Sequence, residues 1–247
     1  MHLEEFAEGK SILHNLDPRV KIIVFVVFSI FCVLAPGVKL PLFFLFYSLA
    51  LLFIARPNTK AFISRLAMAN LFIGIVWIFI PLSYKGNTYL ALGSMNVSQE
   101  GIQYAVSITL KSNAVIIGTI ALISTSSAFR LAHAMLHLKV PKKLIILFFL
   151  FYRYITVVHE EYLTIKRAIL LRGFVPRTDI HTYRTFAYMV GGLLIKSYER
   201  AEEIYKAMLC RGFGGSFPLL DHFRMGHRDA LFLLLSILTF FAFWMKS

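Results

Sequence analysis

Six long apolar runs divide this chain, and they limit the folds that it can adopt more than any other feature of the sequence. A helix of about 20 apolar residues spans the hydrocarbon core of a bilayer, and shorter runs do so when flanking residues extend them. With 58% hydrophobic and 16% charged residues, the chain is excluded from the class of soluble single domains. The runs are Val20 to Ala35, Leu40 to Ala55, Leu66 to Tyr84, Ile102 to Ser124, Leu144 to Val158 and Ala230 to Met245.

The basic residues are sorted along the sequence, and this sorting predicts the orientation of the chain in the membrane. The net charge is +13, and all but four of the 26 Lys and Arg residues lie within residues 1 to 21, 56 to 65 and 125 to 229. Cytoplasmic loops of membrane proteins carry an excess of Lys and Arg. We therefore expect a multi-pass protein of the inner (cytoplasmic) membrane whose N-terminus lies in the cytoplasm.

One apolar run conflicts with this orientation. Leu144 to Val158 has basic residues on both sides, and a span cannot have two cytoplasmic ends. We therefore predict that it begins one long helix, Leu144 to Leu171, and that Phe186 to Cys210 forms a second such helix. A shorter amphipathic helix, Ala128 to Leu138, precedes both. The other five runs are predicted spans: 20 to 35, 40 to 55, 66 to 84, 102 to 124 and 230 to 245.

The predicted fold class is therefore all-α: a polytopic membrane protein with about five transmembrane helices and a cytoplasmic module of long helices. Residues 1 to 124 are expected to form an N-terminal membrane region with four spans. Residues 125 to 229 form the cytoplasmic or interfacial module, and residues 230 to 247 form the C-terminal transmembrane helix.

The chain contains one short sequence motif twice, at the predicted ends of the two long helices. Residues 167 to 174 read Arg-Ala-Ile-Leu-Leu-Arg-Gly-Phe, and residues 206 to 213 read Lys-Ala-Met-Leu-Cys-Arg-Gly-Phe. An arginine in the last turn faces the negative end of the helix dipole, and the following glycine can adopt the left-handed cap conformation. The pair predicts two matching docking surfaces, although two ordinary helix caps would also explain it. The residues concerned are Ala168, Arg172, Gly173, Ala207, Arg211 and Gly212.

Motifs for catalysis or nucleotide binding are missing from the sequence. There is no Gly-x-Gly-x-x-Gly, no phosphate-binding loop and no His-Glu-x-x-His. His133 and His137 have the spacing of metal ligands, but no third ligand accompanies them, so we expect no metal site. Glu160 and Glu161 are expected to pair with nearby basic residues rather than to act as acid and base. Lys111, inside a predicted span, is expected to serve helix packing more than a substrate path. No catalytic residue and no cofactor is predicted.

Three stretches make the chain resemble the transmembrane T component of energy-coupling factor (ECF) transporters, in particular the cobalt type (CbiQ-like) and its nickel counterpart. They are Leu-Asp-Pro-Arg-x-Lys at residues 16 to 21, Tyr-Arg-Tyr at residues 152 to 154, and the double Ala-x-x-x-Arg-Gly motif. The resemblance implies that Arg172 and Arg211 end coupling helices that dock on two ATP-binding cassette ATPase subunits. It also implies that the metal ligands belong to a separate substrate-binding membrane subunit.

The resemblance therefore implies a non-catalytic coupling subunit of an ATP-driven cobalt importer, with ATP hydrolysis by its partners, in contact with lipid and not with nucleic acid. The same role in nickel or vitamin import is an alternative. A self-contained channel or secondary carrier is a second alternative, which would require polar ligands or inverted repeats among the spans.

Overall fold

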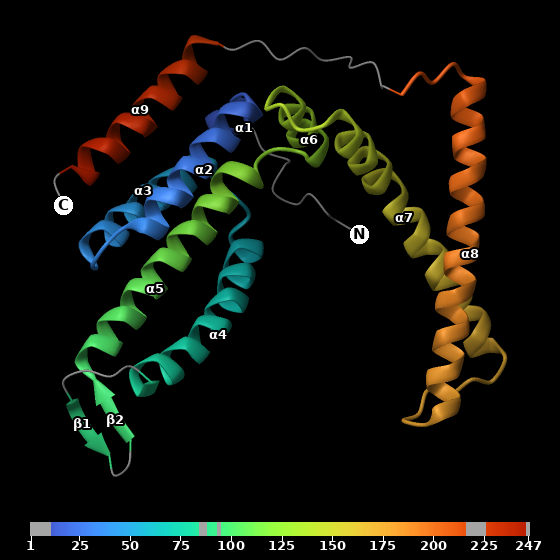
Figure 1. Ribbon diagram of the computed structural model, residues 1–247, viewed down its shortest axis with the longest axis horizontal. Coiled ribbons are helices and arrows are strands. Elements are labelled where there is room, and N and C mark those ends of the chain that lie inside the picture. Colours follow the sequence, from blue (N-terminus) through green and yellow to red (C-terminus); the bar gives the residue numbers. More distant parts are fainter. Residues whose placement is uncertain (1–10, 84–87, 93–94, 216–225, 246–247) are drawn as a thin grey trace. The chain divides into compact units, whose positions relative to one another are not determined.

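The computed structural model describes residues 11–83, 88–92, 95–215 and 226–245 (Figure 1). The chain divides into two compact units. The first, which we call the membrane unit, contains helices α1 to α6, a short β-hairpin and α9. The second, which we call the hairpin unit, contains the long helices α7 and α8.

The membrane unit consists almost entirely of apolar helices. Its elements are α1 (Ile12–Asn15), α2 (Pro18–Leu34), α3 (Lys39–Ala55), α4 (Thr59–Ser83), β1 (Thr88–Leu92), β2 (Met95–Ser98), α5 (Gln99–Gly118), the π-helix η1 (Thr119–Ile123), α6 (Ala128–His137) and α9 (His227–Trp244). Three of these helices are long and apolar enough to cross a membrane: Thr59–Pro81, Gln99–Ile123 and His227–Trp244. Lys39–Ala55 is a shorter apolar helix. The helical membrane fold is thus confirmed, whereas the count of five spans stays a prediction.

The β-hairpin adds a feature that the expectation of an all-helical chain did not contain. Strands β1 and β2 pair antiparallel, with Leu92 opposite Met95. In the sequence, Gly93 and Ser94 separate two short segments of β-branched and apolar residues, which is a pattern typical of hairpins. The segment is too short to alter the fold class.

Helix α2 lies at the centre of the membrane unit and contacts α3, α5, η1, α6 and α9. Four of its residues, spaced one turn apart, have exposed fractions of 0–1%: Val20, Val24, Phe28 and Cys32. This spacing places them on one face of the helix. The Phe28 ring contacts the rings of Phe44 in α3 and Phe240 in α9, with centroids 5.6 and 5.9 Å apart. The core is therefore built from residues far apart in the sequence.

Polar side chains inside the membrane unit hold helices together. The Lys111 ammonium donates a 2.9 Å hydrogen bond to the Val33 carbonyl, one of the unpaired carbonyls at the C-terminal end of α2. Asn70 in α4 and Asn113 in α5 exchange two amide hydrogen bonds of 2.9 and 3.0 Å. Such bonds join helices where water is absent. Lys111 thus takes part in helix packing, as predicted.

The hairpin unit consists of α7 (Lys142–Leu171) and α8 (Ile180–Cys210), joined by a short loop (Figure 1). The sequence predicted the long helix that begins near Leu144, and α7 confirms it. Helix α8 begins six residues before the predicted Phe186 because the Asp179 side chain caps it, accepting a 2.8 Å hydrogen bond from the Thr182 amide. Hydrogen bonds from Thr182 also hold the pKa of Asp179 below its usual value.

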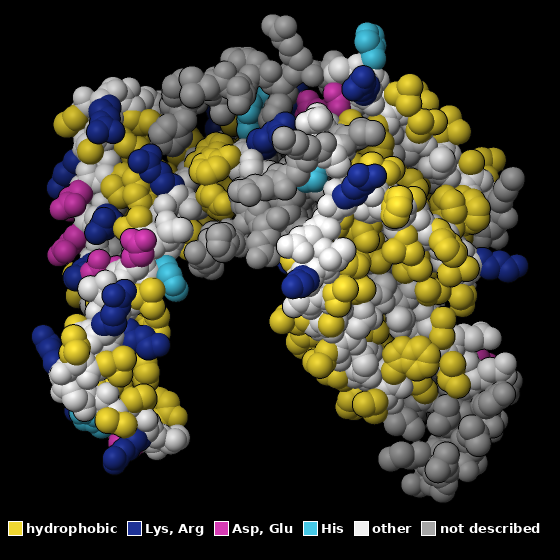
Figure 2. Space-filling model, turned by 180° about the vertical axis from the view of Figure 1, so that it is seen from behind, with side chains coloured by type: hydrophobic (Ala, Val, Ile, Leu, Met, Phe, Trp, Pro, Cys, Tyr) yellow, Lys and Arg dark blue, Asp and Glu magenta, His cyan; other side chains and the backbone are white. Residues whose placement is uncertain are grey.

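Charged residues distinguish the surfaces of the two units. Figure 2 shows hydrophobic side chains spread over the helices of the membrane unit and Lys, Arg, Asp and Glu side chains interspersed along the hairpin unit. In α4, exposed apolar side chains include Ile63, Leu71, Phe72 and Phe79. An apolar surface of this kind fits lipid, whereas the charged helices of the hairpin unit fit water or a polar partner.

Candidate functional site: the paired arginine tips

The first predicted docking surface, Ala168 to Phe174, is the C-terminal end of α7, and we call it the first tip. Arg172 is the cap residue, and Gly173 follows it with a φ of +80°. The Gly173 amide donates to the Leu170 carbonyl (3.0 Å) and the Phe174 amide donates to the Ile169 carbonyl (3.4 Å). These two bonds form a Schellman motif, which requires a left-handed residue at the glycine position. The arginine is therefore held at a closed helix end.

The second tip, Ala207 to Phe213, repeats this geometry at the C-terminal end of α8. Arg211 is the cap residue, and Gly212 has a φ of +77°. The Gly212 amide donates to the Leu209 carbonyl (2.9 Å) and the Phe213 amide donates to the Met208 carbonyl (3.0 Å). Both copies of the repeated motif thus form the same C-terminal helix cap. The expected left-handed glycine is found in both.

The predicted contact residues of both tips are exposed. Arg172, Arg211, Ala168 and Ala207 all lie on the surface of the hairpin unit. Among the residues that the structure describes, the two guanidinium groups have no ion pair and no hydrogen bond. Each alanine lies one helical turn before its arginine, so the two share a face. Each tip therefore presents a cation beside a small side chain, which leaves room for the backbone of a partner.

Phe174 anchors the first tip, and its role was not predicted. Its ring meets the Phe186 ring edge to face, with centroids 6.0 Å apart, and lies 6.2 Å from the His181 ring. Ile169, Leu170 and Met189 line the same apolar pocket. A hydrophobic residue after a Schellman glycine commonly packs in this way. The signal was present in the sequence, because the phenylalanine is identical in both copies of the repeat.

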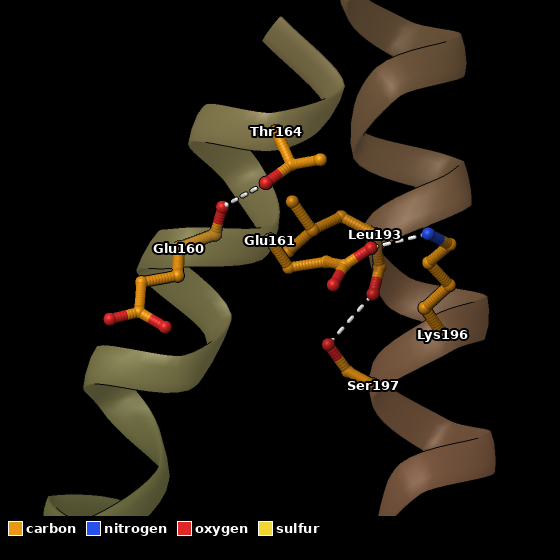
Figure 3. A network of polar contacts seen from close by, with 6 residues as sticks. All are labelled: Glu160, Glu161, Thr164, Leu193, Lys196 and Ser197. Atoms are coloured by element: carbon orange, nitrogen blue, oxygen red, sulfur yellow. Dashed lines mark hydrogen bonds and ion pairs between the residues drawn. The ribbon is translucent and has the colours of Figure 1, made fainter. Parts of the chain in front are cut away.

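An ion pair joins α7 and α8 where the two helices pack (Figure 3). The Lys196 ammonium donates a hydrogen bond to Glu161 Oε1. This hydrogen bond, together with the charge of Lys196, lowers the pKa of the Glu161 carboxyl below its usual value. The prediction that Glu161 pairs with a basic residue is confirmed, whereas the neighbouring Glu160 uses its backbone carbonyl to accept a 2.9 Å hydrogen bond from Thr164.

The two tips lie far apart on the hairpin unit. Phe174 packs on Phe186 near the start of α8, and Arg211 follows the last residue of the same helix. At 1.5 Å per residue, the stretch of α8 from Phe186 to Arg211 is about 38 Å long. The helix α8 thus separates the two tips by more than the radius of a small domain.

The two histidines with metal-like spacing are close together. The His133 and His137 rings in α6 have centroids 5.2 Å apart. Within the described ranges, no group of three or more His, Cys, Asp or Glu residues is arranged to hold a metal ion.

Residues 9–222 match the family model CbiQ, described as a cobalt transport protein. This chain belongs to the CbiQ family. It is 24% identical over 241 residues to an uncharacterized protein of Methanocaldococcus jannaschii, an alignment that covers 95% of this chain and 82% of the relative. It is 24% identical to the energy-coupling factor transporter transmembrane protein EcfT of Brevibacillus brevis, with 95% and 93% of the two chains covered.

Another relative of this CbiQ-family chain is named for a different metal. The nickel permease LarQ of Lactiplantibacillus plantarum is 34% identical over 93 residues, which cover 37% of this chain and 33% of the relative. Family membership and the apolar helices together make the chain a multi-pass membrane protein of a transport family.

Proposed function

We propose that this chain is the coupling subunit of an ATP-driven ECF-type importer and that its two tips dock on two ATP-binding cassette ATPase subunits. The observation that carries the proposal is the pair of identical capped arginine ends, Arg172 and Arg211, at separate ends of one hairpin. A partner that binds both must present two equivalent grooves, and a pair of like ATPase subunits does so. Membership of a cobalt transport family, and a relative named as an energy-coupling factor transporter transmembrane protein, support the same role.

In this proposal the chain binds no nucleotide and hydrolyses nothing. ATP binding brings the two ATPase subunits together, and the hairpin unit passes this movement to a substrate-binding membrane subunit. We place the N-terminus and both tips on the cytoplasmic side because the basic residues concentrate there. Polar residues within the helices favour a scaffold over a channel, since Lys111, Asn70 and Asn113 all have hydrogen-bond partners within the chain.

The transported ion is proposed to be cobalt, following the description of the family model. Nickel is the second candidate because one relative is named a nickel permease. The complex, reconstituted with its ATPase and substrate-binding subunits, should take up radiolabelled Co²⁺ in preference to Ni²⁺ in a direct competition. The reverse preference would assign the chain to nickel transport.

The docking role is tested by reversing the charge of both tips. Loss of one arginine from a buried charged contact costs about 2 to 5 kcal/mol of binding free energy, so Arg172→Glu combined with Arg211→Glu should abolish both copurification of the ATPase subunits and metal uptake. Arg177→Glu is the matched control, because Arg177 is an exposed arginine of the same unit outside the repeat. Normal copurification and uptake by the double variant would reduce the tips to ordinary helix caps.

A further inference from the structure

The start of α2 contains a buried cation that the docking role does not use. Lys21 has an exposed fraction of 0% and is one of the largest fully buried side chains among the described residues. Its ammonium lies 2.7 Å from Ser126 Oγ and 3.4 Å from Thr125 Oγ1, which accept its hydrogen bonds. Both hydroxyls belong to the turn at residues 124–127, which lies between η1 and α6.

The same segment is tied to the start of α9. The Asp17 amide donates a 2.9 Å hydrogen bond to Asp229 Oδ1, and the Gly226 amide donates to Asp229 Oδ2, also at 2.9 Å. Asp17 and Lys21 are one turn apart and so share a face of α2. The hydrogen bonds of Asp17, Lys21, Thr125, Ser126 and Asp229 thus join three segments that are separated by more than 100 residues in the sequence.

A buried lysine bound only to hydroxyl groups is a poor source of stability. Removing an ammonium from water is costly, and an apolar side chain of similar volume, such as methionine, would often fill such a site at lower cost. A buried charged group instead requires its partners at fixed positions, because any movement leaves it unpaired. Lys21 is therefore better suited to holding the turn at residues 124–127 in place than to stabilising the core.

The turn that Lys21 holds leads through α6 to the hairpin unit. Ser127 caps α6, accepting a hydrogen bond from the Arg130 amide, and α6 ends two residues before Lys139, which has a φ of +64°. The chain then passes through Pro141 into α7. This connection is one of the two places where the chain passes between the units, so movement of the hairpin unit acts on the membrane unit through it.

We propose that Lys21 is a positioning residue that fixes the 124–127 turn to α2, so that movement of the hairpin unit is passed to α2 and α9 and is not lost in the turn. The proposal rests on the coupling function proposed above. It assigns a role to the basic end of the Leu-Asp-Pro-Arg-x-Lys stretch, which packing alone does not require.

The test compares Lys21→Met with Lys111→Met. Lys111 is a matched control because its ammonium also bonds to α2, but at the opposite end of that helix. Hydrogen exchange of residues 123–128, measured on the full chain in detergent without ATPases, should rise about tenfold in Lys21→Met, as expected for loss of a buried charged hydrogen bond. It should stay unchanged in Lys111→Met. In the reconstituted complex, Lys21→Met should lower the amount of metal transported per ATP hydrolysed while ATPase copurification stays normal.

A merely structural role would lower thermal stability and the yield of complex and would leave the ratio of metal to ATP unchanged, and this result would overturn the proposal. Unchanged exchange at residues 123–128 would also overturn it. If Lys21→Met does not accumulate, the combination Thr125→Val with Ser126→Ala removes the same bonds and is judged by the same two measurements. The exchange measurement needs no ATPase, so failure of the docking role, seen with the arginine variants, is told apart from failure of this proposal.

Discussion

Replacing Gly212 by alanine tests whether the closed helix end is what holds the second arginine in place. Gly212 has a φ of +77°, and a Cβ added there would meet no atom within 4 Å. The change therefore introduces backbone strain without a steric clash. A left-handed conformation costs a residue with a Cβ about 1 to 2 kcal/mol, and this corresponds to a roughly 5- to 30-fold loss in the population of the closed end.

The same substitution at Gly192 provides a control of opposite sign. Gly192 lies inside α8, and an added Cβ would also meet no atom within 4 Å there. Alanine in a helix interior is more stable than glycine by about 1 kcal/mol, so Gly192→Ala should stabilise the helix in which Gly212→Ala opens the end. Gly212→Asn should be intermediate, because asparagine tolerates the left-handed conformation.

The assay is hydrogen exchange of the amides of residues 212 and 213, which close the cap in the wild-type chain. Their protection should fall roughly 5- to 30-fold in Gly212→Ala, and ATPase binding should weaken by no more than the same factor. Gly192→Ala should leave both quantities at or above the wild-type level. Equal exchange in Gly212→Ala and Gly192→Ala would refute the argument that the cap holds the arginine.

Three further predictions concern packing, pH and topology. Gly118→Ala should destabilise the membrane unit by about 1 to 3 kcal/mol, because its Cβ would lie 2.8 Å from the Phe28 ring; Gly74→Ala, which has open space, should not, and thermal unfolding in detergent compares the two. Because the pKa of Glu161 is lowered in the folded protein, its pairing with Lys196 stabilises the hairpin unit above the unfolded pKa of about 4.3 and is lost as the pH falls through the folded pKa. Glu161→Gln should therefore show a weaker acid-induced rise in hydrogen exchange of α7 and α8, and a wild-type-like rise would contradict this. In a Cys32→Ser, Cys210→Ser background, a cysteine at Lys39 should react with an impermeant reagent outside intact cells and one at Arg177 should not; external labelling at Arg177 would reverse the assigned orientation.

Interactions between residues that are close in the sequence allowed the C-terminal ends of the long helices to be predicted. The Arg-Gly-Phe phrase specifies a cap through residues that are adjacent in the chain, and Gly173 and Gly212 both adopt the expected left-handed conformation. Asp17 also caps α2 as its position before Pro18 predicts, since its side chain accepts a hydrogen bond from the Arg19 amide. Interactions within one or two turns need no knowledge of the tertiary fold.

Long-range contacts could not be predicted in the same way. Nothing near Lys21 in the sequence identifies Ser126 as its partner, and nothing near Asp17 points to Asp229. The start of α8 was placed late because the polar residues before Phe186 interrupt the apolar run, while the Asp179 cap acts ahead of them. Whether residues 125 to 229 act as one module stays a prediction, although α6 packs on α2 within the membrane unit.

The ion pair between Glu161 and Lys196 divides each helix of the hairpin into lever arms of unequal length. From this point the arm to Arg172 is about 16 Å long and the arm to Arg211 about 22 Å long, at 1.5 Å per residue. A rotation by about 10° around this point would move the Arg211 tip by roughly 4 Å if α8 turns and the Arg172 tip by roughly 3 Å if α7 turns. In the coupling role proposed above, equal rotations of the two helices would therefore displace the two tips by unequal amounts.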